Sequence, residues 1–385
     1  MIAPLAMRPF APSQRNALSL NTGRARPPLG LLAGILRADG VSWRERITTI
    51  RWFARQRRGG FRCSELMSVT QLIEGLSSTI REGLLVPLCI AALNTPPGRA
   101  SAQVFLNVLR EAFDDAPDGS AVVLPRHDLG HVIPERCAAW LVANGHNVRR
   151  STRVKLMNDA RGIRVLDGEG EMLADAAVVA VGPHQLRATF DTRLAESEAS
   201  IGFALETVER FEWEAITTVY LAYAQAVSVP SGLVRLDDAP GQWVFDRADI
   251  LARASENSHA REIRSLLAVV LSAHRAGRDA PAGSLSHAVD AQLRRLDPSL
   301  PPLAWSKVIA EKRATYACVP GLARPPNGRL ARGIYLAGDY TYERFPATLE
   351  AAVRSGIAAA QAVTGDFRDR ACATGVAARD STPAP

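Results

Sequence analysis

The sequence predicts a mixed α/β fold in which helical and β-sheet segments of two domains are interleaved along the chain. Three observations predict it: a helical first third, a β-meander near the middle, and a strand that leads into a long helix near the C-terminus. At 385 residues the chain is long enough for two domains. Its composition, 47% hydrophobic and 22% charged, is typical of a folded globular protein and excludes wholesale disorder.

Both ends of the chain lack the hydrophobic periodicity of folded elements. Residues 1–28 combine Arg, Ser, Pro and Ala without an acidic residue, which resembles a transit peptide in composition. They lack the continuous apolar centre of a secretory signal, and we interpret them as a disordered leader. Residues 367–385 mix Arg, Asp, Thr and Pro without periodicity and are interpreted as a disordered tail.

The block from residue 29 to residue 120 is expected to be helical. Ser42 to Glu45 has the S-x-x-E form of a capping box, and six arginines share the following run with apolar residues at helical spacing. Such a basic amphipathic helix can lie in a membrane interface. A surface helix with its apolar side in the core fits the pattern equally well. A second capping box predicts a further helix that begins near Ser68, and an apolar stripe predicts another that begins near Ser101.

Strands are expected to dominate the next part of the chain. Apolar and polar residues alternate from Val148 onward, and Asp167-Gly-Glu-Gly170 has the composition of a hairpin turn. These features predict a β-meander that ends in a buried strand at 176–181. Further strands are predicted at 217–222, 266–271 and 333–338, with helices at 285–297 and 346–363.

The segment around Gly338 and Asp339 carries the strongest chemical signal. A buried strand ends at Gly338, where the missing side chain would let a ligand approach the backbone. Asp339 follows as a carboxylate that can accept hydrogen bonds from sugar hydroxyls. Pro346 suits a first helical turn, which would leave the amides of Ala347 and Thr348 free to stabilise an electron-rich group such as the edge of a reduced flavin. A strand–Gly–Asp–helix unit is also common as plain structure.

The same helix carries a narrow apolar stripe of Leu349, Val353, Gly356 and Ala360. The small residues in this stripe leave room for a close neighbour.

The full string, residues 333–339 followed by 346–356, resembles the C-terminal FAD signature of the phytoene desaturase and amine oxidase flavoproteins. Within that superfamily it is most similar to the squalene-associated FAD-dependent desaturases, known as the hydroxysqualene dehydroxylases of bacterial hopanoid synthesis. Other segments are similar in the same order, and together they cover about residues 29–363: residues 87–97, 100–101, 107–110, 124–129, 140–141, 217–221, 242–247 and 311–315.

The resemblance implies that FAD binds between a partial three-layer nucleotide domain and an interleaved helical and β-sheet substrate domain. Asp339, beside Gly338, would hold the ribityl or pyrophosphate region, and Ala347 and Thr348 would lie against the isoalloxazine. Val154 matches the strand whose backbone contacts the adenine. The implied division is a helical part of the substrate domain at 29–120, FAD-domain strands at 121–190, substrate domain at 191–310 and a C-terminal FAD segment at 311–366.

The implied reaction is the reductive dehydroxylation of hydroxysqualene to squalene, so the expected partner is an apolar isoprenoid. Trp213, Tyr220, Trp243 and Phe245 are candidates for the substrate tunnel, with core packing as the alternative role for each. Asp246 is no more than a guess for the proton donor, and no catalytic residue is assigned.

A substrate this apolar is delivered from a membrane, which favours a peripheral contact at the inner membrane face for an otherwise cytoplasmic protein. The five cysteines form no CxxC pair and indicate thiols in a reducing compartment. The net charge of +7 comes almost entirely from arginine. No zinc-finger spacing or aromatic–basic pattern accompanies this charge, so we expect no nucleic-acid partner.

The sequence departs from the family at its front. The superfamily opens with a strand, a G-x-G-x-x-G loop for the pyrophosphate and a helix, and this chain contains no such loop. Three alternatives to an active enzyme therefore stay open: a truncated copy, a pseudoenzyme that keeps the lipid-binding half, or a missing unit encoded just upstream.

Other chemistries have less support in the sequence. It contains no G-x-S-x-G elbow and no G-x-x-x-x-G-K-[ST] phosphate loop. His127 and His131 lie four residues apart without the H-E-x-x-H pattern, so a surface loop is expected there and no metal site is predicted.

Overall fold

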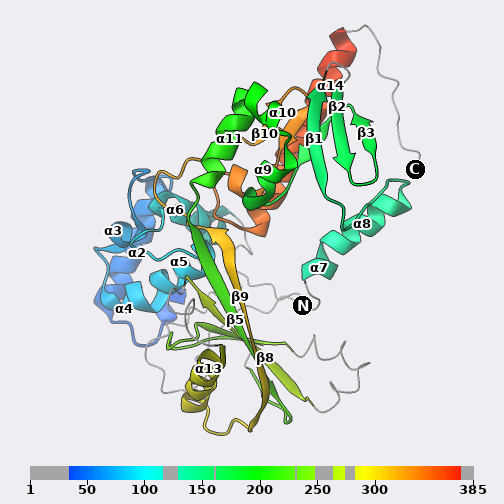
Figure 1. The fold of residues 1–385 in the computed structure, drawn as a ribbon. Helices are drawn as coiled ribbons and strands as arrows, with labels where there is room; N and C mark the ends of the chain where they lie inside the picture. Colours follow the sequence, from blue (N-terminus) through cyan, green and yellow to red (C-terminus); the bar gives the residue numbers. More distant parts are fainter. Residues whose placement is uncertain are drawn as a thin grey trace, which may run out of the picture. The chain divides into compact units, whose positions relative to one another are not determined.

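The fold was analysed in a computed structural model that describes residues 34–115, 129–159, 162–229, 232–247, 263–273 and 282–373. The chain forms two compact units. Unit 1 comprises Met1–Val148 and Glu212–Gly321, and unit 2 comprises Arg149–Phe211 and Leu322–Pro385. The predicted mixed α/β class is confirmed, because each unit contains both helices and sheet strands (Figure 1). The unit boundaries, which follow Val148, Phe211 and Gly321, lie further along the chain than the domain boundaries predicted at 120/121, 190/191 and 310/311.

The helices of unit 1 begin where local capping dictates. In α2 (Trp43–Arg58) the Ser42 amide donates to Glu45 Oε2 over 2.8 Å, and the Glu45 amide donates to Ser42 Oγ over 3.4 Å. The Ser42 hydroxyl, which donates to Glu45 Oε2 over 2.7 Å, is the largest cause that lowers the pKa of Glu45 to about 2, and the Ser42 amide acts in the same direction. Both predicted capping boxes are confirmed, the second one at Ser68 and Gln71.

The helical core of unit 1 is closed by the apolar sides of these helices. Trp52 and Phe53 from α2 pack with Phe105 and Leu109 from α6. Complete burial of a large apolar side chain contributes roughly 1.5–3 kcal/mol. The elements are α2, α3 (Val69–Ile73), α4 (Ser78–Ile80), the π-helix η1 (Arg81–Leu85), α5 (Val86–Leu93), α6 (Ala102–Arg110), the π-helix η2 (Glu111–Asp115), α7 (Leu129–Val132) and α8 (Pro134–Ala143).

Unit 1 also contains a five-stranded antiparallel sheet of order β6-β7-β8-β5-β9. Helix α13 (Ala282–Leu296) covers one face, where Leu285, Val289 and Leu293 pack on Val219 and Leu221 (Figure 1). The strands are β5 (Trp213–Tyr223), β6 (Leu233–Arg235), β7 (Trp243–Asp246), β8 (Ser265–Ser272) and β9 (Leu303–Tyr316).

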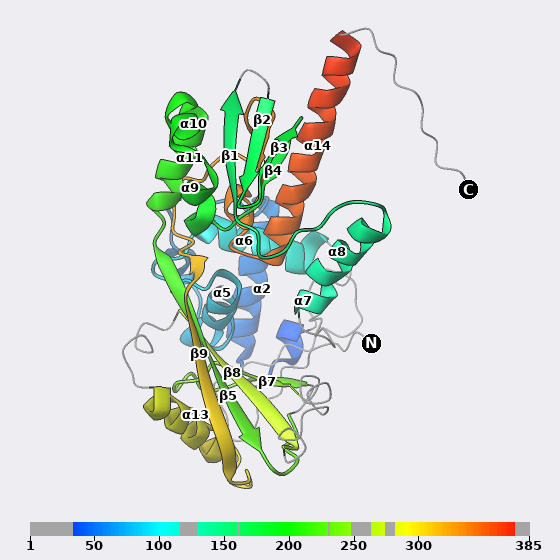
Figure 2. The same ribbon diagram turned by 45° about the vertical axis from the view of Figure 1, so that its right-hand side comes forward.

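Unit 2 contains two three-stranded sheets and a long helix. The predicted meander is an antiparallel sheet of order β1-β2-β3, and the second sheet has the order β10-β11-β4. Figure 2 shows α14 running beside these strands. The elements are β1 (Val154–Asp159), β2 (Gly162–Asp167), β3 (Glu171–Ala174), β4 (Ala177–Val179), the 3-10 helix η3 (Pro183–Gln185), α9 (Leu186–Thr189), α10 (Thr192–Ser197), α11 (Ala199–Glu209), β10 (Gly328–Ala331), β11 (Ile334–Leu336), the 3-10 helix η7 (Asp339–Thr341) and α14 (Leu349–Ala373).

Two of the differences from the sequence prediction concern the start of the meander and the end of the last helix. The meander begins at Val154 rather than Val148, and α14 continues to Ala373, past the predicted start of the tail at residue 367. In the C-terminal part of α14, Asp366 accepts a hydrogen bond from Tyr335 Oη over 2.7 Å, which joins this part of the helix to β11. Within the described ranges, none of the helices combines the length and hydropathy needed to cross a bilayer.

Candidate functional site

Gly338 lies just after β11, directly before η7, with a φ of +155°, a conformation that other residues rarely adopt. A Cβ at this position would overlap the ring of Tyr340. That ring is buried, and its hydroxyl donates to the Val181 carbonyl over 3.2 Å. The packing of Tyr340 therefore gives a reason for the glycine within the chain itself, and the approach of a ligand to this backbone stays a prediction.

Asp339 directly follows this turn and is half-buried. Burial raises the pKa of Asp339, while the Tyr340 amide and the charge of Arg324 oppose the rise. Arg324 is itself buried, and its Nη1 donates to the Tyr342 and Phe345 carbonyls over 2.8 Å each. The arginine therefore holds the loop that connects Asp339 to α14 and places a positive charge near the carboxyl.

The helix after this loop begins at Leu349, not at Pro346 as predicted. Thr348 caps it, because its Oγ1 accepts the Ala351 amide over 3.2 Å, and threonine is a favourable N-cap. Ala347 and Thr348 thus precede the helix. The first-turn amides that lack a helical partner are those of Leu349 and Glu350. The positive end of the helix dipole therefore lies at these residues and not, as expected, at Ala347 and Thr348.

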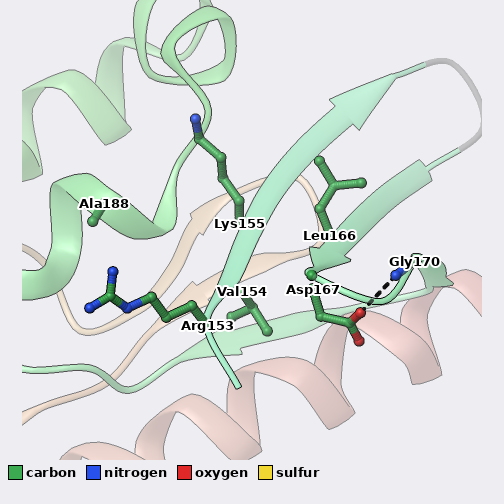
Figure 3. A pocket seen from close by; sticks show the side chains of 8 residues that line it. Arg153, Val154, Lys155, Leu166, Asp167, Gly170 and Ala188 are labelled. Atoms are coloured by element: carbon green, nitrogen blue, oxygen red, sulfur yellow. Dashed lines mark hydrogen bonds between the residues drawn. The ribbon is translucent and has the colours of Figure 1, made fainter. Parts of the chain in front are cut away.

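Val154 lies at the start of β1 beside a pocket of about 450 Å³ (Figure 3). Arg153, directly before β1, extends its side chain to the side on which Ala188 lies, and Lys155 within β1 points in another direction. Among the described residues Arg153 has no ion pair, whereas Lys155 Nζ lies 3.7 Å from Asp191 Oδ2. The pocket lining comprises Arg153, Val154, Lys155, Leu166, Asp167, Gly168, Gly170 and Ala188.

The opposite rim of this pocket is the hairpin turn after β2. Asp167 Oδ1 accepts the Glu169 and Gly170 amides over 3.0 Å each, and Asp167 pairs with Arg149. The Glu169 amide is the largest cause that lowers the pKa of Asp167, and Arg149 acts in the same direction. The pocket therefore combines a fixed carboxylate with two cationic side chains, which suits a polar, phosphate-bearing ligand.

Three of the four predicted substrate residues share one face of the unit 1 sheet. Tyr220 and Phe245 both pair with Ala268, while Trp243 pairs with the neighbouring Val270. Paired residues in adjacent strands point to the same face, and Val244 between the two β7 aromatics packs on the α13 side. The aromatic side chains therefore lie on the face that α13 leaves open, which we call the aromatic face.

Two predicted residues do not join the aromatic face. Trp213 pairs with Tyr316 at the far end of β5, roughly 23 Å along the strand from Tyr220 at about 3.3 Å per residue. Asp246 follows Phe245 in β7 and points to the opposite face because side chains alternate along a strand. The guess that Asp246 donates a proton to a ligand on the aromatic face is therefore disfavoured.

The structure adds residues that sequence reasoning missed. Ile309 pairs with Thr218 and Trp305 with Ala222, so both extend the aromatic face across β9, with exposed fractions of 48% and 44%. Only the register between β5 and β9 identifies these two residues, because no local sequence pattern marks them. Arg153 and Arg324 were also missed, although Arg153 is the immediate neighbour of Val154. His131 Nδ1 lies 3.1 Å from Glu135, while His127 and Asp128 lie outside the described residues.

A family model described as flavin containing amine oxidoreductase matches residues 19–364. The chain belongs to this family. The predicted fold class and superfamily are confirmed by this match, and so is FAD as the cofactor of the family. The crystal structure of an oxidoreductase from Methanosarcina mazei shares the fold, with a TM-score of 0.58 and 12% identity over 85% of this chain and 73% of that one.

Two curated relatives have more specific names. A hydroxysqualene dehydroxylase of Rhodopseudomonas palustris is 29% identical over 74% of this chain, and one of Sinorhizobium fredii is 27% identical over 74%. The chain spans 63% and 62% of the length of these relatives.

Replacing Asp339 by asparagine is expected to raise the free energy of unfolding of the flavin-free protein at pH 7. A carboxyl whose pKa is raised on folding stabilises the native state below its unfolded pKa of about 3.9, and this contribution is lost as the pH rises through the folded value. The neutral amide removes the cost of burying the charge. Denaturant unfolding at pH 4 and pH 7 measures the effect. A loss of stability at pH 7 would contradict it.

Proposed function

We propose that this protein is an FAD-dependent oxidoreductase of squalene and hopanoid biosynthesis that reductively dehydroxylates hydroxysqualene to squalene. The observation that carries the proposal is the turn at Gly338 and Asp339, which leads into an α14 capped by Thr348, within a chain of the flavin-containing amine oxidoreductase family. The names of the two curated relatives support the specific reaction.

The residues of unit 2 suit the parts of FAD in two places. Asp339 would accept hydrogen bonds from the ribityl hydroxyls, with Ala347, Thr348 and the first amides of α14 facing the electron-rich edge of the isoalloxazine. The pocket beside Val154 would take the adenosine end, and Arg153 and Lys155 would offset phosphate charge there.

Hydroxysqualene becomes squalene when a C–O bond is replaced by a C–H bond and water is released. FAD in its reduced form would supply the hydride that carbon needs and be left oxidised, and the departing hydroxyl oxygen would need a proton to leave as water. The protein would contribute orientation and exclusion of water. We assign no residue as the proton donor.

The aromatic face of unit 1 is the surface that we propose for the isoprenoid chain. Tyr220, Trp243 and Phe245 give it a rigid apolar surface, and Ile309 and Trp305 extend it. A C30 hydrocarbon can bind only by apolar burial, so several adjacent aromatic side chains suit it better than isolated polar groups. Because such a substrate dissolves in bilayers, we further propose a cytoplasmic protein that contacts the membrane peripherally.

The first experiment measures FAD binding to the purified chain by absorbance and by titration of flavin fluorescence. The proposal expects a bound flavin spectrum, and Asp339→Asn should weaken FAD binding about 10- to 100-fold, since a hydrogen bond to a charged group contributes about 1.5–3 kcal/mol. Asp369→Asn, on the exposed side of α14, is the matched control and should leave binding unchanged. An absence of flavin binding at micromolar FAD would refute catalysis by this chain alone.

Trp243→Ala is expected to weaken the binding of squalene roughly tenfold, because burying a large aromatic side chain contributes about 1.5–3 kcal/mol. Trp140→Ala is the control, since Trp140 lies exposed on α8 and outside the aromatic face. Quenching of intrinsic fluorescence by squalene dispersed in detergent measures both variants. Equal losses in the two variants would exclude the aromatic face as the isoprenoid site.

A second candidate is a non-catalytic lipid-binding protein, and one observation favours it. Strand β4 pairs in parallel with β11 on one edge, and no described strand pairs with its other edge. Val178 faces the α14 side, since it pairs with Tyr335 and Tyr335 reaches Asp366 of α14, yet Val178 is 48% exposed. Parallel sheets are normally covered on both faces.

Helix α14 also has an uncovered apolar surface. Its outward stripe of Leu349, Val353 and Ile357 is exposed, and a Cβ at Gly356 would meet no atom within 4 Å. These surfaces leave room for a further strand and helix beside β4. If squalene binds and FAD does not, the lipid-binding alternative replaces the enzyme.

A further inference from the structure

Helix α2 exposes an unusual combination of side chains on the side that faces away from the core. Thr49, Trp52 and Phe53 anchor the opposite side. Trp43 is 66% exposed and Ile47, one turn later, is 46% exposed. Large apolar side chains gain nothing from contact with water, so their position at one end of a solvent-facing helix points to a partner.

Four arginines occupy the same exposed side: Arg44, Arg51, Arg55 and Arg58. In a projection down the helix axis at 3.6 residues per turn, Trp43, Ile47 and the four arginines lie within an arc of roughly 120°. Within the described part of the chain none of these arginines forms an ion pair. The helix has one carboxylate, that of Glu45, and it is bound to the amide and hydroxyl of Ser42.

The indole of Trp43 is held in place on this side. The guanidinium of Arg46 lies over its ring, 4.9 Å from the centroid, and Arg46 Nη2 in turn donates to the Ala38 carbonyl over 2.8 Å. Trp43 is therefore presented by a fixed neighbour, which lowers the entropy cost of inserting it into a partner.

We propose that this face of α2 binds an anionic phospholipid surface, with the helix axis parallel to the membrane. Trp43 and Ile47 insert at the level of the head groups, where tryptophan is favoured, and the four arginines pair with lipid phosphates. The charge is complementary, because the face has four cations without an ion pair and no free carboxylate among the residues that the structure describes. The proposal uses only unit 1 and does not depend on flavin binding or on the reaction.

The test uses the whole purified chain and flotation with vesicles of 70% phosphatidylcholine and 30% phosphatidylglycerol, compared with pure phosphatidylcholine. Binding is expected only to the anionic vesicles and should be lost in 0.5 M NaCl. Each arginine near the surface contributes about a fivefold factor, so the triple variant R51Q/R55Q/R58Q should bind on the order of 100-fold more weakly.

The matched control is R150Q/R193Q/R332Q, which removes the same charge from exposed positions of unit 2 and should change binding less than twofold. Trp43→Ala should weaken binding roughly tenfold without changing its salt dependence. Circular dichroism spectra and thermal unfolding of all variants should match those of the parent, since the substituted positions are exposed.

Three outcomes would overturn the proposal: equal binding to neutral and anionic vesicles, equal losses in the two triple variants, or tighter binding to a 20-base-pair DNA duplex than to anionic vesicles. Membrane binding without flavin binding would leave the α2 proposal standing and refute the enzymatic one. Flavin binding without membrane binding would refute the α2 proposal and leave the enzymatic one standing.

Discussion

Gly338→Ala is expected to lower the free energy of unfolding by about 2–4 kcal/mol. The backbone at this position has a φ of +155°, and the new Cβ would overlap the buried ring of Tyr340. To make room, the ring would have to leave its site and give up the hydrogen bond from its hydroxyl to the Val181 carbonyl. Equilibrium unfolding in urea, monitored by circular dichroism, measures the loss.

Gly356→Ala is the matched control, because it makes the same chemical change within α14. No atom lies within 4 Å of the added Cβ, and alanine is favoured over glycine in a helix by about 1 kcal/mol. This variant should therefore be more stable than the parent. If Gly338→Ala changed stability by less than 0.5 kcal/mol, roughly the typical effect of an ordinary surface substitution, the packing of Tyr340 would not be the reason for the glycine.

Arg324→Met is expected to lower the free energy of unfolding by about 2–4 kcal/mol. The substitution leaves the buried Phe345 carbonyl without its arginine donor and leaves the Tyr342 carbonyl with only the 3.4 Å bond from the Phe345 amide. A buried unsatisfied group costs about 1–3 kcal/mol. It also removes a positive charge that lowers the pKa of Asp339, so this pKa should rise further. Urea unfolding gives the free energy, and a titration of the Asp339 carboxyl by NMR gives the pKa.

Two further variants separate charge from hydrogen bonding at this position. Arg324→Lys keeps the charge near Asp339, so the pKa of that carboxyl should stay close to the parent value while part of the stability is lost. Arg332→Met, at an exposed position, should change stability by less than about 0.5 kcal/mol. A loss in Arg332→Met equal to that in Arg324→Met would show that burial of Arg324 is not the cause.

Local signals predicted the helix starts in unit 1 well. A capping box is formed by residues three positions apart, so the sequence alone shows the two boxes, Ser42 with Glu45 and Ser68 with Gln71. At α14 two local rules competed. Pro346 suits a first helical turn and Thr348 suits an N-cap, and the hydrogen bond from the Ala351 amide decides for Thr348.

The long-range parts of the candidate site were beyond sequence reasoning. Nothing local marks Arg324 as the group that holds the loop after Asp339, because its acceptors lie 18 and 21 residues away. Similarly, the hydrogen bond between Tyr335 of β11 and Asp366 of α14 joins residues 31 positions apart, and no local pattern predicts it.

The sequence by itself determined the fold class, the family and the Gly338–Asp339 turn, because these depend on residue types at short, fixed spacings. Tertiary structure alone decided which aromatic side chains meet. Tyr220, Trp243 and Phe245 share a face and Trp213 does not, since strand register is set by pairing between segments far apart in the chain. It also decided that the ring of Tyr340 packs beside Gly338, because only the folded backbone brings that ring against the glycine.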